Sequence, residues 1–245
     1  MFKESKTGLG ELWAEKIASE LGKLLHLNMM NVYFAKSNRT NGVIMENFVP
    51  NGHILIEGAD LLTKAIPSFN VNSLEYYSIE NIMNEIETFK MEQDFIDLCI
   101  FDALIAGTDR HCENWGIIDS GTHYYFAPIY DNGSSLGFNL HQKKLELYER
   151  DLQAFKAFNN RTITQIEVDG KRKPRVKLLL NFLFKNYKNL FVNSMEKFAL
   201  LNNDEVLYII NKIPLEIMNE REKQWVKRLV FYRYNWLTNF EWEEC

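Results

Sequence analysis

Residues 107–137 constrain the fold most strongly, because they place two short apolar segments between clusters of acidic and amide side chains. Residues 115–118 and 124–129 have the length and composition of strands, and Ser120 and Gly121 provide a turn between them. The polar residues flank these segments and do not alternate within them. The block therefore predicts a small antiparallel hairpin with a polar loop at each of its outer ends.

Helical spacing of apolar residues dominates most of the remaining chain. Residues 9–27 place leucines, Trp13 and Ile17 on one helical face, and residues 79–90 and 92–106 continue the pattern up to a stop at Gly107. From residue 153 to the end the pattern is almost entirely helical, apart from a basic loop. Few turn-forming residues, 12 Gly and 5 Pro, agree with a helix-rich fold.

The first 50 residues have a different organisation. A short strand-like start precedes the first helix, and residues 30–36 and 42–49 predict a β-hairpin with a loose turn over the polar residues between them. Pro50 then begins a segment without a sustained period that extends to about residue 77. We therefore expect a small α+β part over residues 1–50 and a mainly helical part over residues 51–245.

Charge and cysteine content exclude several classes of protein. The chain has 28 basic and 33 acidic side chains, a net charge of −5, so we expect no direct DNA binding. Three cysteines without a CxxC pair indicate neither a disulfide framework nor a zinc site, and a reducing cytoplasm fits best. The longest apolar stretch is interrupted by Asp97 and Asp102, so we expect neither secretion nor a membrane span.

Three polar residues of the central block have the spacing of a phosphoryl-transfer site. Asp109 and Asn114 are separated like the Asp and Asn of a kinase catalytic loop, and Asp131 follows on the other side of the hairpin. Such a reaction needs a carboxylate that orients an attacking hydroxyl and oxygen ligands for Mg²⁺. The alternative is that these residues only cap and shape turns, as Asp and Asn often do.

At this point the sequence resembles a known family. The segments GTDRHCENWGI and FAPIYDNGSSLG resemble the signature of the HipA-like serine/threonine kinases, which include toxin kinases of the HipA and CtkA type. The resemblance implies a two-lobed, protein-kinase-like α+β fold, related to phosphatidylinositol kinases, with a truncated N-lobe over 1–50 and a helical C-lobe over 51–245. It also implies ATP and Mg²⁺ as cofactors and a protein substrate with a Ser or Thr hydroxyl.

The resemblance also implies roles for single residues. Asp109 would be the catalytic base, and Asn114 and Asp131 would be metal ligands. Lys3 would contact the ATP phosphates, with Glu11 as its ion-pair partner and Glu15 as the second choice.

Three further positions follow from the same resemblance. Main-chain atoms of Glu46 and Phe48 would hydrogen-bond the adenine at the hinge between the lobes. His111 is interpreted as structural support, and Arg110 follows the catalytic Asp instead of preceding it, so a role in sensing loop phosphorylation does not transfer.

The chain departs from the family at its start, because Lys3 is preceded by neither the expected strands nor the phosphate-covering loop. Three explanations are open: a fragment, which we favour, a split kinase completed by an N-lobe partner subunit, or a pseudokinase. The alternative function is thus a non-catalytic nucleotide- or partner-binding module of a toxin–antitoxin system, with an antitoxin partner. A small-molecule kinase is a weaker third alternative.

The basic stretch over residues 171–177 is the local exception in an acidic chain. As a solvated loop it needs no function. Its functional interpretation is docking of an acidic protein or a tRNA-bound substrate near the active cleft.

Overall fold

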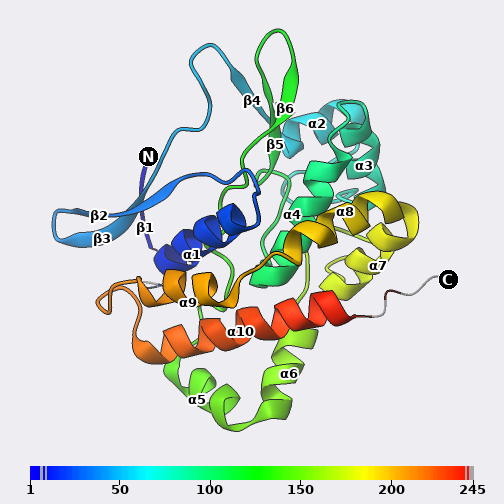
Figure 1. The fold of residues 1–245 in the computed structure, drawn as a ribbon. Helices are drawn as coiled ribbons and strands as arrows, with labels where there is room; N and C mark the ends of the chain where they lie inside the picture. The colour runs from blue at the N-terminus through cyan, green and yellow to red at the C-terminus, as the bar shows by residue number, and fades with distance from the viewer. Residues whose placement is uncertain (6–7, 9, 241, 243–245) are drawn as a thin grey trace.

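The structure is a computed structural model that describes residues 1–5, 8, 10–240 and 242. Two small antiparallel sheets and a larger helical part form an α+β arrangement (Figure 1). The strands are β1 (Phe2–Glu4), β2 (Val32–Ser37), β3 (Thr40–Met45), β4 (Ile54–Glu57), β5 (Gly116–Asp119) and β6 (Tyr124–Phe126). The helices are α1 (Gly10–Leu24), α2 (Gly58–Ala65), α3 (Ile79–Glu87), α4 (Glu92–Ile105), α5 (Gln142–Arg150), α6 (Leu152–Asn160), α7 (Val176–Asn186), α8 (Lys188–Phe198), α9 (Asn203–Asn211) and α10 (Glu220–Asn239).

The N-terminal sheet has the strand order β1-β3-β2, with both pairs antiparallel. Its hairpin turns through Asn38 and Arg39, whose φ angles are 47° and 70°. Positive φ at both central residues is the geometry of a two-residue type I′ turn, whose twist matches that of the paired strands. The turn is therefore tight, and the prediction of a loose turn is wrong.

Helix α1 packs against β2 and β3 and lies beside α9 (Figure 1). Its buried face contains Leu12, Trp13 and Ile17, as the spacing predicts, and it also contains Glu15, which is only 1% exposed. Leu9, the first residue of the predicted helix, lies outside the described residues. A carboxylate on the buried face needs a hydrogen-bonding or ionic partner. Strand β1, which precedes the helix, carries one candidate, Lys3.

The second sheet has the order β4-β5-β6 and is also antiparallel. Because β5 and β6 run in opposite directions, the start of β5 and the end of β6 lie at the same end of the hairpin. The predicted hairpin is confirmed, and it holds the polar loops before β5 and after β6 close together. β4 and α2 were not predicted, since residues 50–77 show no sustained period.

Helix α4 lies at the centre of the helical part and packs against α3, α7, α8 and α10 (Figure 1). It is buried on every side from Phe95 onward, which explains why its residues are mostly apolar apart from Asp97 and Asp102. The helix ends at Ile105, and its left-handed C-cap is Ala106, with a φ of 53°, one residue before the stop predicted at Gly107. Gly107 has another role, because a Cβ there would lie 2.9 Å from the Asp102 carboxylate oxygen Oδ1.

The helical pattern predicted after residue 153 is confirmed by α6 to α10, whereas α5 was not predicted. Among the described residues, no helix is both long and apolar enough to cross a membrane. The division into parts 1–50 and 51–245 stays a prediction.

Candidate functional site

The loop after α4 is held by its own backbone and amide groups. The His111 N–H donates to the Asp109 carbonyl at 2.9 Å, and the Asn114 N–H donates to the His111 carbonyl at 3.0 Å. The Asn114 side chain donates through Nδ2 to the Asp109 carbonyl at 2.8 Å. These bonds leave the Asp109 carboxylate exposed, with the Ser134 hydroxyl 3.5 Å from its Oδ2. Because Nδ2 makes this bond, the Asn114 Oδ1 has no hydrogen-bond donor among the described residues.

The loop after β6 carries Asp131 in a left-handed conformation, with a φ of 52°. Asp tolerates this conformation better than most residues, although it is uncommon outside glycine. The next residue, Asn132, fixes the loop through its backbone: its N–H donates to Glu15 Oε1 at 2.9 Å, and its carbonyl accepts from the Ser135 hydroxyl at 2.6 Å. These bonds thus hold the backbone on the C-terminal side of Asp131 and so help to fix the position of its carboxylate.

The buried Arg110 side chain bonds to both loops. Its Nε and Nη2 donate to both carboxylate oxygens of Asp102, at 2.9 and 2.8 Å, in a buried bidentate pair. Nη1 donates to the carbonyls of Asn114, at 2.7 Å, and Tyr130, at 2.8 Å, and Nη2 donates to Asn132 Oδ1 at 2.8 Å. One guanidinium therefore fixes the end of the first loop and both neighbours of Asp131. Burial opposes the charge on Arg110, but Asp102 outweighs it, so the pKa of Arg110 is raised.

Lys3 extends from β1 into the same site. Its Nζ lies 2.7 Å from Asp131 Oδ1 and 4.0 Å from Glu15 Oε2. Glu11, one turn earlier on α1, accepts a hydrogen bond from the Ser5 hydroxyl at 3.3 Å and forms no ion pair with Lys3 within 4.0 Å in the described part of the chain. Glu15, the second choice, is therefore the carboxylate of α1 within 4.0 Å of the Lys3 ammonium, and the assignment of Glu11 as the ion-pair partner stays a prediction.

The electrostatics of this group are set by burial. Burial raises the pKa of the Glu15 carboxyl, the Asn132 N–H lowers it, and the nearby Asp131 charge raises it, with a net shift upward. Glu15 Oε2 is buried and has no hydrogen-bond partner among the residues that the structure describes. For Lys3, burial lowers the pKa, but Asp131 and the glutamates of α1 raise it by more. Lys3 thus stays charged between Glu15 and Asp131. Its nearer partner is Asp131, the predicted metal ligand.

The expected hinge residues lie where β3 ends. The Glu46 N–H donates to the Asn31 carbonyl at 3.1 Å, and the Glu46 carboxylate accepts from the Asn31 amide at 2.9 Å. The Phe48 ring stacks on Tyr130, with ring centroids 5.2 Å apart. In the described part of the chain, the Glu46 carbonyl and the Phe48 N–H have no partner, so these main-chain atoms could meet a ligand.

His111 and Cys112 have local structural roles. The Glu113 N–H donates to His111 Nδ1 at 3.3 Å, in agreement with the interpretation of His111 as support for the loop. Cys112 is fully buried, and burial raises the pKa of its thiol to about 11. A thiol with so high a pKa is a poor nucleophile at neutral pH.

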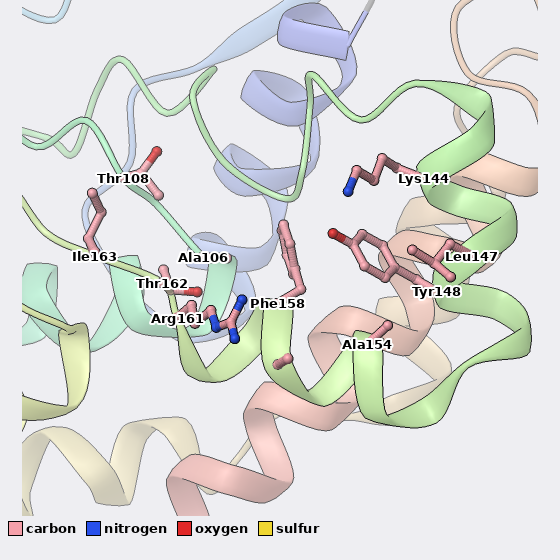
Figure 2. A pocket seen from close by; sticks show the side chains of 11 residues that line it. Ala106, Thr108, Lys144, Leu147, Tyr148, Ala154, Phe158, Arg161, Thr162 and Ile163 are labelled. Carbon is pink, nitrogen blue, oxygen red and sulfur yellow. The ribbon is translucent and has the colours of Figure 1, made fainter.

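A groove of about 420 Å³ opens beside the first loop at Thr108, the residue before Asp109. Figure 2 shows Lys144 and Tyr148 of α5 on one side of Phe158, and Thr108 on the other. Arg161 contributes a second cation to the lining. No acidic side chain among the described residues lines the groove, so its walls are apolar and basic.

The donor set suits a magnesium ion. The described residues contain no cluster of three or more His, Cys, Asp or Glu side chains that could hold a metal by themselves. Mg²⁺ is usually bound by one or two protein oxygens, with the remaining positions taken by phosphate and water. The Asp131 carboxylate and the free Asn114 Oδ1, on loops joined by Arg110, match that requirement.

Comparison with solved structures gives two informative matches. A Helicobacter pylori proinflammatory kinase, CtkA, matches with a TM-score of 0.85 and 18% identity over 98% of this chain and 84% of that chain. A chain of the Shewanella oneidensis MR-1 toxin–antitoxin complex of HipA, HipB and operator DNA matches with a TM-score of 0.63 and 15% identity, over 96% of this chain and 57% of that chain. At these identities the likeness shows the fold, and the predicted α+β, kinase-like fold of the HipA and CtkA type is confirmed.

Sequence comparison gives the family. No curated protein sequence matches the chain significantly. The family model described as HipA-like C-terminal domain matches residues 2–188, which cover most of the chain and all the site residues discussed above. The chain therefore belongs to the family of HipA-like C-terminal domains.

Proposed function

We propose that this chain is an ATP- and Mg²⁺-dependent kinase that transfers the γ-phosphate of ATP to a Ser or Thr hydroxyl of a protein. The observation that carries the proposal is the bonding of Arg110 to both polar loops, which brings the Asp109–Asn114 loop and Asp131 to one site. Phosphoryl transfer depends mainly on positioning and charge stabilisation, and this site is built for both.

Asp131 and Asn114 are the proposed metal ligands. Bound Mg²⁺ would neutralise negative charge on the phosphates during transfer. Asp131 contributes a carboxylate oxygen that is now bonded to Lys3, and Asn114 contributes its free Oδ1. Because Arg110 bonds to both loops, the loops that carry the two oxygens are already held together, and metal binding costs less conformational entropy.

Lys3 is the proposed phosphate contact. Its ammonium group bonds to Asp131 at 2.7 Å and lies 4.0 Å from Glu15 Oε2. A phosphate beside Lys3 competes with Asp131 for the ammonium, and Glu15 then keeps the side chain oriented. Glu15 is buried, and its Oε2, which has no hydrogen-bond partner within the described part of the chain, is placed to accept that bond.

Asp109 is the proposed base. It is exposed and bonded only weakly to Ser134, so its carboxylate can accept a proton from an incoming hydroxyl. We assign the groove lined by Thr108, the residue before Asp109, to the polypeptide substrate. The main-chain carbonyl of Glu46 and the N–H of Phe48 are the groups we assign to adenine.

We expect Asp131→Asn to abolish the Mg²⁺ dependence of ATP binding, because an amide removes the charge that attracts the cation. Calorimetric titration of ATP with and without Mg²⁺ measures this. Asp119→Asn, on the β5–β6 hairpin, is the matched control and should bind Mg²⁺-ATP like the parent chain. Equal Mg²⁺ dependence in all three proteins would contradict the metal assignment.

The Glu15 assignment has a test of its own. We expect Glu15→Gln to lower kcat/KM for ATP by about 10- to 100-fold, since each 1.4 kcal/mol of lost positioning is a factor of ten. Glu11→Gln, one turn away on the same helix, should change kcat/KM several times less. If Glu11→Gln has the larger effect, Glu11 and not Glu15 orients the lysine.

An antitoxin partner is proposed on the likeness to the Shewanella complex, in which HipA is assembled with HipB and operator DNA. A non-catalytic module that binds such a partner is the alternative function. The two differ in their response to Asp109→Asn, because a binding module is indifferent to this change and a kinase is not.

A further inference from the structure

Helix α10 carries a buried arginine that has no carboxylate partner among the described residues. Arg233, on α10, is 2% exposed. Its Nε donates to the Ala103 carbonyl, and its Nη1 donates to the Asn159 carbonyl at 3.2 Å and to the Thr162 hydroxyl at 3.0 Å. No acidic side chain among the described residues lies within 4.0 Å of it, in contrast to Arg110 with Asp102. Burial lowers the pKa of Arg233 to about 9.

Arg233 lines a cavity of about 460 Å³ that also contains Arg175 and Lys177. These two cations belong to the basic stretch 171–177, which the kinase site does not use. No acidic residue among those described lines the cavity. Arg233 is buried without a carboxylate partner among the described residues, which is costly for a charged group, and the exposed Arg175 and Lys177 add two further cations at which an anion could bind.

Other groups of the cavity wall complement an anionic ligand. Helix α7 begins at Val176, so the positive end of its dipole lies at the cavity. Arg233 Nη2 has no hydrogen-bond partner in the described part of the chain, and Asn159 Oδ1 is buried and unpartnered. Donors are therefore in excess, and one acceptor is left for a ligand hydroxyl or a protonated phosphate oxygen.

Aromatic side chains form the remaining wall. Tyr232, Trp236 and Phe240 line the cavity beside the cations. Such a wall favours a ligand whose anionic group is attached to a flat or apolar body, and the volume is that of a small-molecule site. Guanidinium groups bind phosphate through paired hydrogen bonds.

We propose that this cavity, defined by Arg175, Lys177 and Arg233, is a binding site for a phosphate monoester, separate from the kinase site. The phosphate lies among the three cations, and the body of the ligand lies against the aromatic wall. The proposal is independent of the kinase function, because none of these residues belongs to the proposed catalytic site.

The test is calorimetric titration of the full chain with inorganic phosphate and with phenyl phosphate, at constant ionic strength set with chloride. We expect both to bind, phenyl phosphate more tightly. Arg175→Ala combined with Lys177→Ala should weaken both by at least about tenfold, because two charge-assisted contacts are lost. Both side chains are exposed, so the variant should keep the parent fold, which circular dichroism verifies.

The matched control removes two charges from the same basic stretch outside the cavity, Lys171→Ala with Lys173→Ala, and should leave both affinities within about twofold. Hydrogen exchange provides the location: phosphate should slow exchange in residues 159–177 and 229–240. Equal weakening in the two double variants, protection confined to residues 107–114 and 131–135, or absence of binding at millimolar phosphate would each overturn the proposal. Tighter binding of inorganic phosphate than of phenyl phosphate would overturn the role of the aromatic wall.

Discussion

Replacing Arg110 with methionine is expected to lower the free energy of unfolding by about 3–5 kcal/mol, because it leaves the buried Asp102 carboxylate without its cation. The guanidinium also donates to the carbonyls of Asn114 and Tyr130 and to Asn132 Oδ1, all of which would lose a donor. Urea unfolding followed by circular dichroism measures the change.

Two comparisons make this prediction specific. Arg150→Met, at an exposed position of α5, should change stability by no more than about 0.5 kcal/mol. Combining Arg110→Met with Asp102→Leu should recover part of the loss, since replacing both members of a buried pair with apolar residues removes the uncompensated charge. If Arg110→Met is no more harmful than Arg150→Met, Arg110 does not hold the loops together.

Asp109→Asn is expected to reduce phosphate transfer by about 10²- to 10⁴-fold, the range for loss of a general base. The amide keeps the size of the side chain and its contact with Ser134, so the fold and the affinity for Mg²⁺-ATP should stay close to those of the parent. Initial rates with labelled ATP, together with calorimetric ATP binding, separate the chemical step from binding.

Glu113→Gln is the control for Asp109→Asn. Glu113 is an exposed carboxylate of the same loop and forms a 3.6 Å contact with His111. We expect the Glu113→Gln variant to transfer phosphate at a rate within a few-fold of that of the parent chain. Equal losses in the two variants would mean that charge in the loop, and not a base at Asp109, supports transfer.

The elements predicted correctly are those with a clear apolar period. The buried faces of α1 and α4 and the hairpin of β5 and β6 could be identified because the spacing of their apolar residues is set by local geometry. Helix α5 was missed because only Leu145 and Tyr148 of it are buried, so it has almost no apolar stripe. Helix α2 was missed because it has eight residues and follows a short strand directly.

The tight turn at Asn38 and Arg39 shows a different limit. Asn favours a positive φ, but Arg does not, so the residue types do not predict a type I′ turn. The pairing of β2 with β3 imposes it. The residue types likewise do not predict that the left-handed cap of α4 is Ala106 and that Gly107 lies where a Cβ would come within 2.9 Å of Asp102 Oδ1.

In the site, the sequence indicated the residues that we propose as reacting groups better than the residues that hold them in place. The spacing of Asp109, Asn114 and Asp131 is local to one hairpin, so it could be found without a structure. The choice between Glu11 and Glu15 depends on the rotation of α1, and the available signal was that Glu15 shares a face with Leu12 and Ser19.

Arg110 was not recognised as the residue that joins the loops. The signal for it was Asp102, a carboxylate within the largely apolar second half of α4, because such a buried acid needs a cation. The sequence does not say which cation this is. Contacts between residues far apart in the chain, such as Lys3 with Asp131, are equally invisible until the fold is known.

The most direct test of the kinase assignment is transfer of labelled γ-phosphate from ATP in the presence of Mg²⁺, by the 245-residue chain, to itself and to proteins of a cell lysate. The account predicts label on Ser or Thr with the parent chain and none with a folded Asp131→Ala variant. Absence of label from the folded parent chain, or equal label from the Asp131→Ala variant, would contradict it.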